Sequence, residues 1–215
     1  GRADFADNQL QVSALTDGAL FTLRAQVPEL PDRVSAILIA DVVATRIAFA
    51  TLPTDPDASN GDIVSGKSFV TQPILEARDP SGITDLHYQG NPLSLSVLSG
   101  DLNLSGTTTQ SWSNGQATFD NLVISHPTDG ATFTLQASNG TLPQIATAPL
   151  RSDVVASQLV YVQEIDHDGV PNGDILSGVA FQTQPIVEAQ DASGALDLHF
   201  QDPIALSANT GTLSG

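Results

Sequence analysis

The chain has 215 residues, of which 40% are hydrophobic, and its formal net charge is −17 at pH 7 because it carries seven Lys and Arg against 24 Asp and Glu. This apolar content is sufficient for a packed core, whereas the negative charge would repel nucleic acid and anionic membrane surfaces. No apolar run approaches the roughly 18 residues of a membrane span and cysteine is absent, so membrane insertion, disulfides and zinc–sulfur sites are not expected.

The sequence predicts β-strands throughout, because short runs rich in Thr, Val, Ile and Phe alternate between polar and apolar residues. Gly, Pro, Asn, Asp and Ser cluster between these runs, and no capped stretch has helical periodicity. In chain order, we expect the strands of one complete unit near 45–51, 67–77, 92–98, 101–105, 116–124, 131–137 and 143–150. Seven short strands of this kind, named A to G, suggest a two-sheet sandwich.

Three segments of the chain recur at one fixed spacing. "TDGALFTLRA" from Thr16 matches "TDGATFTLQA" from Thr128, and "ADVVAT" from Ala40 matches "SDVVAS" from Ser152. "NGDIVSG" from Asn60 likewise matches "NGDILSG" from Asn172, and in all three pairs the copies lie 112 residues apart. A constant offset across separate segments predicts tandem units of about that length.

The runs "GKSFVTQPILEARDPSG", "NGQATFDNLVI" and "ATFTLQASNG" resemble a bacterial immunoglobulin-like repeat of the Big type, and the resemblance covers essentially the whole chain. It implies an all-β fold of tandem immunoglobulin-like β-sandwich repeats of about 112 residues. It also implies the extender region of a giant calcium-dependent adhesin, secreted to the bacterial cell surface. The implied partners are calcium and the neighbouring repeats of the same chain.

The phase of the repeats divides the chain into three parts. Residues 45–155 form a complete repeat, residues 1–44 supply strands E to G of the preceding repeat, and residues 156–215 supply strands A to D of the following one. The outer parts are complementary halves of one sandwich, so we expect head-to-tail self-association between molecules. In the alternative, the strand order is permuted and residues 1–106 and 115–215 are two self-contained domains.

Two acidic turns are candidates for a calcium site. The turn "IDHDGVPNGDILSG" contains Asp166, Asp168, Asn172 and Asp174. Its upstream counterpart contains Asp55, Asp57 and Asp62. Calcium takes roughly six to eight oxygen ligands, which carboxylates, Asn amides and backbone carbonyls supply. The glycine spacing is not that of an EF-hand, and the same residue types are also typical of a plain polar turn.

The sandwich topology brings further carboxylates to the same end of each unit. The A–B loop, the E–F loop and the outgoing linker lie there, so Asp129 and Asp153 join the upstream acidic turn. Asp17 and Asp41 take the same positions one repeat earlier, and the B–C loop of the next unit can add carboxylates from residues 191–197. Carboxylates gathered in this way repel one another unless a cation lies between them. We therefore predict calcium at the unit junctions.

Other chemistry has little support in the sequence. His87 and His199 occupy matching segments with no second histidine nearby, so a structural or surface role is favoured over a metal pair or a general base. Trp112 could stack on a sugar ring, but packing against a sheet is the simpler expectation. No Ser lies in a G-x-S-x-G context and no Gly-rich phosphate loop opens a helix, so the chain is not expected to be an enzyme.

Two functional hypotheses follow from these patterns. The first is a structural spacer, stiffened by calcium at the junctions of its repeats. The second is a binding module, in which one loop end recognises a carbohydrate or a protein. Repeats that match along their length favour the spacer, because a receptor site is usually confined to one differing domain.

Overall fold

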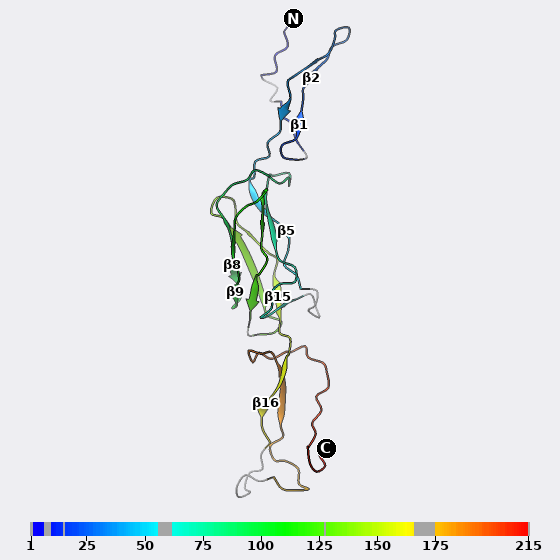
Figure 1. Cartoon of the computed structure of the whole chain (residues 1–215), viewed down its shortest axis with the longest axis vertical. Coiled ribbons are helices and arrows are strands. Elements are labelled where there is room, and N and C mark those ends of the chain that lie inside the picture. Colours follow the sequence, from blue (N-terminus) through cyan, green and yellow to red (C-terminus); the bar gives the residue numbers. More distant parts are fainter. Residues whose placement is uncertain are drawn as a thin grey trace.

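The computed structural model describes residues 2–6, 10–14, 16–55, 62–126, 128–165 and 175–214. Secondary structure in these residues is essentially all β, which confirms the predicted class. Figure 1 shows an elongated molecule in which a central unit (residues 44–153) separates an N-terminal segment (residues 10–41) from a C-terminal segment (residues 156–214). No helix in the described part of the chain has the length and apolar character needed to cross a membrane.

One sheet of the central unit has three antiparallel strands in the order β11–β7–β5. They are β5 (Arg46–Thr51), β7 (Ile74–Arg78) and β11 (Gln116–Thr118). A separate antiparallel pair joins β9 (Asn103–Ser105) to β12 (Val123–Ser125). The chain passes from β11 to β12 through residues 119–122, where Phe119 and Leu122 are both buried.

The other sheet of the central unit runs in the order β10–β8–β13–β15–β6, with β14 paired to β13. Its strands are β6 (Ile63–Val64), β8 (Leu93–Ser99), β10 (Thr109–Gln110), β13 (Thr132–Ser138), β14 (Ile145–Ala146) and β15 (Leu150–Asp153). All of these pairs are antiparallel except β15 with β6, in which Ser152 lies opposite Ile63 and Asp153 opposite Val64. This parallel pair joins the stretch between β5 and β7 to the outgoing linker.

Alternation along the strands turns one apolar face of each sheet into a shared core. In β8, Leu93 and Leu95 are buried whereas Ser94 and Ser96 are exposed, as expected for a period of two. Both sheets contribute to a single cluster that includes Ile47, Leu75, Ala77, Leu93, Leu95, Phe119, Leu122, Ile124, Phe133, Leu135 and Ala137. The central unit is therefore sandwich-like.

The two flanking segments contain short strands and few buried side chains. In the N-terminal segment, β1 (Leu20–Phe21) pairs with β4 (Leu38–Ile39), and β2 (Arg24–Ala25) pairs with β3 (Arg33–Val34). In the C-terminal segment, β16 (Gln158–Gln163) pairs with β17 (Ile186–Gln190). The exposed apolar side chains of these segments include Leu10, Val12, Leu23, Leu159, Ile175 and Ile204.

Three of the predicted strands are wrong in extent, and the one expected at 143–150 is divided into β14 and β15, which ends at Asp153. The strand expected at 67–77 begins only at Ile74, because the Gln72 side chain takes over hydrogen bonds that a strand ladder would make. Its amide donates to the Phe69 and Leu122 carbonyls (3.1 and 3.2 Å), and its oxygen accepts from the Leu122 amide (3.0 Å). The strand expected at 116–124 is split into β11 and β12. Phe119 and Leu122 would face opposite sides of a continuous strand, and the split lets both reach the core.

Pairing between strands contradicts the permuted arrangement. β8 pairs with β13 and β7 pairs with β11, so strands before residue 106 and after residue 115 belong to the same sheets. Trp112, which lies between these strands, is buried in the core, as the packing interpretation predicted. Its Nε1 donates to the Asn91 carbonyl (2.8 Å), and its ring meets Tyr88 edge to face with centroids 5.0 Å apart.

Candidate functional site at the unit junctions

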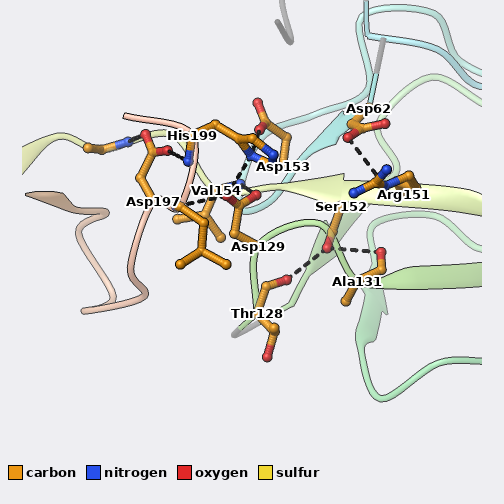
Figure 2. A network of polar contacts seen from close by, with 12 residues as sticks. Asp62, Thr128, Asp129, Ala131, Arg151, Ser152, Asp153, Val154, Asp197 and His199 are labelled. Atoms are coloured by element: carbon orange, nitrogen blue, oxygen red, sulfur yellow. Dashed lines mark hydrogen bonds and ion pairs between the residues drawn. The ribbon is translucent and has the colours of Figure 1, made fainter. Parts of the chain in front are cut away.

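The second junction, between the central unit and the C-terminal segment, is centred on Asp129 (Figure 2). Asp129 lies in the tight turn between β12 and β13, and its side chain is fully buried. Its Oδ1 accepts a hydrogen bond from the Val154 amide in the linker (3.0 Å). Its Oδ2 accepts from the Leu198 amide of the C-terminal segment (2.9 Å) and lies 2.8 Å from Nδ1 of His199. One carboxylate therefore holds the linker and the following segment at once.

The first junction, between the N-terminal segment and the central unit, repeats this geometry. Asp17 Oδ1 accepts from the Val42 amide (2.9 Å), and Asp17 Oδ2 accepts from the Leu86 amide (3.0 Å). Nδ1 of His87 lies 2.8 Å from the same Oδ2. Each of these residues stands 112 positions before its counterpart at the second junction. The repeat seen in the sequence is thus also a repeat of three contacts between neighbouring parts of the chain.

A second aspartate at each junction fixes the histidine-bearing loop. Asp85 Oδ2 accepts from the Ala44 amide (3.0 Å), and its Oδ1 accepts from the His87 amide (3.1 Å). Asp197 makes the matching bonds to the Ala156 and His199 amides, both at 2.9 Å. We call each set of two aspartates and one histidine a junction clasp: Asp17, Asp85 and His87 at the first junction, and Asp129, Asp197 and His199 at the second.

The two junctions differ in the burial of the linker aspartate, which is Asp41 at the first and Asp153 at the second. Burial raises the pKa of Asp17, but hydrogen bonds from Val42, His87 and Leu86 outweigh burial and hold that pKa below its usual value. The linker residue Asp41 next to this clasp is exposed. Its counterpart at the second junction, Asp153, is buried.

Asp153 is a buried carboxylate without a hydrogen bond among the described residues. Its side chain is 5% exposed, and its one ion-pair contact in this part of the chain is with Nδ1 of His199, at 4.0 Å. Burial raises the pKa of Asp153, and the carboxylates of Asp129, Asp197 and Asp62 raise it further. Asp62 itself lies 3.7 Å from the Arg151 guanidinium, too far for a strong pair. This end of the central unit therefore has more buried negative charge than the described cations neutralise.

The structure brings together some of the predicted site residues and not others. Asp62, Asp129 and Asp153 surround the second junction, and Asp17 and Asp41 lie at the first. Asp55 is buried in the central unit and has contacts of its own. Asp57, Asp166, Asp168, Asn172 and Asp174 lie outside the described residues, so their role as calcium ligands stays a prediction.

The B–C loop of the C-terminal segment contributes to the junction through one of its two aspartates. Asp197 belongs to the second clasp, whereas Asp191 accepts hydrogen bonds from the Ser193 and Ala195 amides within its own loop. His87 and His199 have the structural role that the sequence favours, each beside a buried aspartate, but the sequence does not place them at the junctions. The signal that could have found them is the recurrence of "DLH" at the same offset as the aspartates Asp17 and Asp129.

At each junction three donor atoms lie close enough to share a cation, and at the first junction this trio includes Asp41 and not the clasp residue Asp85. One atom each from Asp129, Asp197 and His199 lies within 4.8 Å of the others, and the same holds for Asp17, Asp41 and His87. Calcium prefers oxygen ligands, and the carboxylates of Asp129, Asp197 and Asp62, which raise the pKa of Asp153, offer them at the second junction. The unbonded, buried carboxylate of Asp153 is the observation that favours a cation at this place.

No family model, curated protein or solved structure matches the chain. Its function is therefore inferred from its own residues and their geometry.

Proposed function

We propose that the chain is a structural extender: tandem immunoglobulin-like repeats that act as a spacer in a bacterial cell-surface adhesin. The observation that carries this proposal is the junction clasp, which recurs with the same partners and nearly the same distances one repeat apart. A spacer needs every joint to be alike, because each unit does the same mechanical task. A receptor site needs one unit to differ.

The strand order of the central unit supports the immunoglobulin-like assignment. Strand A corresponds to β5, B to β7, D to β9, and E to β11 together with β12. Strands C, F and G correspond to β8, β13 and β15. In this proposal residues 45–155 are one complete repeat, and residues 1–44 and 156–215 belong to its neighbours. The resemblance of the sequence motifs to Big-type repeats gives the adhesin context and the cell-surface location.

A spacer transmits length only if its joints resist bending, and the clasp supports this property. The linker residues Val42 and Val154 are buried, and their amides are bonded to the preceding unit. Two residues further on, the amides of Ala44 and Ala156 are bonded to the following loop. A linker held at both ends by aspartate side chains is not a flexible tether.

Calcium completes the proposal at the second junction. Asp62, Asp129 and Asp153 would hold the ion, which would neutralise carboxylates that otherwise repel one another. The ion would supply only charge neutralisation and cross-bridging, since the proposed task is mechanical. Extracellular modules commonly bind calcium at roughly 10⁻⁴–10⁻³ M, so millimolar and not micromolar calcium should matter.

Melting and small-angle scattering in EDTA and in millimolar calcium test the extender. A ligand that binds only the folded state stabilises it by about 2.7 kcal/mol at a hundredfold excess over Kd. We expect calcium to raise the melting temperature and to hold the molecule at a greater maximum dimension. Identical melts and identical dimensions in both buffers would contradict the calcium part. Specific, saturable binding on a glycan array would instead favour a binding module.

A further inference from the structure

Arg151 brings one positive charge to the carboxylates of the second junction. It lies on β15 two residues before Asp153, and its Nε is 3.7 Å from Oδ2 of Asp62. Among the described residues, this arginine is the only ion-pair partner of Asp62. Figure 2 shows the pair in the same network as Asp129 and Asp153. The charge of Arg151 therefore acts on the residues proposed to hold calcium.

A glycine leaves room for the guanidinium over the turn that carries Asp129. Gly130 has a φ of +70°, and a Cβ at this position would lie 2.9 Å from the Nη2 atom of Arg151. That distance is shorter than an ordinary van der Waals contact, so a side chain at residue 130 would push the guanidinium away. Arg151 thus lies beside both the turn of Asp129 and the carboxylate of Asp62.

The contact between Arg151 and Asp62 is one that a stronger cation can replace. Its length of 3.7 Å exceeds that of a hydrogen bond, and the Arg151 side chain is 53% exposed, so water screens its charge. A divalent ion at this place would also neutralise Asp153, whose side chain is 5% exposed and has no hydrogen bond among the described residues. Calcium can therefore satisfy two carboxylates where Arg151 pairs with one.

The charge at residue 151 is not part of the set of contacts that repeats. The residue one repeat earlier is Ile39, although the clasp residues match at both junctions. The clasp therefore forms with either residue type, and Arg151 is not needed to build it. Its effect lies in the charge balance of one junction.

We infer that Arg151 sets the calcium affinity of the second junction by competing with the ion for Asp62. Without calcium, the guanidinium offsets part of the negative charge of Asp62. With calcium bound to Asp62, the same positive charge lies beside the ion and repels it. Both effects weaken binding, because one favours the empty site and the other disfavours the occupied site. The inference rests on the calcium site of the proposed function and adds the residue that tunes it.

A calcium titration of the full chain, followed by NMR at the Val154 amide, tests the inference, since that amide is bonded to Asp129. Arg151→Gln removes the charge from a half-exposed side chain, and we expect it to lower the calcium Kd about fivefold at low ionic strength. Arg151→Lys keeps the charge and should stay close to the unmodified chain. Arg33→Gln is the matched control, because it removes the same charge from an exposed residue of the N-terminal segment, which Figure 1 places at the other end of the molecule. This control should leave the Kd unchanged.

Salt separates the charge of Arg151 from its shape. Raising the salt concentration from roughly 0.1 M to 1 M shortens the screening length from about 10 Å to about 3 Å, so the difference between Arg151→Gln and the unmodified chain should shrink. Equal Kd values for these two chains, an equal gain in affinity in Arg151→Lys, or a difference that persists at high salt would each overturn the inference and leave the calcium site standing. No calcium response at Val154 in any chain would overturn the inference together with the calcium part of the proposed function.

Discussion

Replacement of Asp129 by Ala should loosen the second junction by an amount that the structure bounds. The substitution leaves two backbone amides without their acceptor, that of Val154, which is buried, and that of Leu198, which is only partly buried. An unsatisfied buried donor costs about 1–3 kcal/mol, whereas water can replace the acceptor at a partly buried one. The contact to His199 adds little, since the imidazole is 39% exposed and screened by solvent.

Native-state hydrogen exchange measured by NMR reads this loss directly at the Val154 amide. A loss of about 1–3 kcal/mol corresponds to exchange that is roughly 5- to 150-fold faster. Asp129→Asn keeps one acceptor oxygen but turns an amide group toward one of the donors, so its effect should be smaller. The Val42 amide, bonded to Asp17 at the other junction, is an internal control and should not change. Unchanged exchange at Val154 in the Asp129→Ala chain would refute the clasp.

Three further predictions concern the two junctions. Asp153→Asn should raise the unfolding free energy in EDTA at pH 7, because it removes a buried carboxylate with a raised pKa. The same substitution should abolish the response to calcium. As a control, Asp120→Asn changes an exposed carboxylate and should have neither effect. Because the folded state binds the Asp153 proton more tightly than the unfolded state does, this destabilisation is full above the folded pKa and is lost as pH falls toward the unfolded value. Urea titrations should therefore show the advantage of Asp153→Asn shrinking between pH 7 and about pH 4. Gly115→Ala should lower the melting temperature more than Gly140→Ala: both glycines have positive φ, but a Cβ at Gly115 would lie 2.1 Å from the Asp85 carbonyl oxygen, and one at Gly140 meets nothing within 4 Å.

The sequence predicts those strands best whose side chains alternate without interruption. The run at 93–98 and the run at 131–137 correspond closely to β8 and β13, because each has small polar residues between apolar ones. The pattern fails where a side chain replaces a backbone partner, as Gln72 does, or where the chain bends between Phe119 and Leu122. The polar–apolar periodicity of the sequence reveals neither the hydrogen bonds of Gln72 nor the bend after Phe119.

The acidic end of each unit is predictable for a different reason. Once the strands are ordered, topology alone places Asp129 and Asp153 at the same end of the central unit. Which atoms those carboxylates bind is not predictable in the same way. Asp129 is held chiefly by the backbone amides of Val154 and Leu198. The sequence does not indicate which amides will lack a strand partner and be free to bind a side chain.

The division of the clasp between neighbours has a consequence for how such a protein can change in length. The acceptor, Asp17 or Asp129, is carried by one unit, and the amide donors and the histidine are carried by the linker and the next unit. In the proposed extender each joint has the same parts, so adding or removing a whole unit creates no new kind of interface. The length of the proposed extender can therefore change by whole units, while each joint keeps the same contacts.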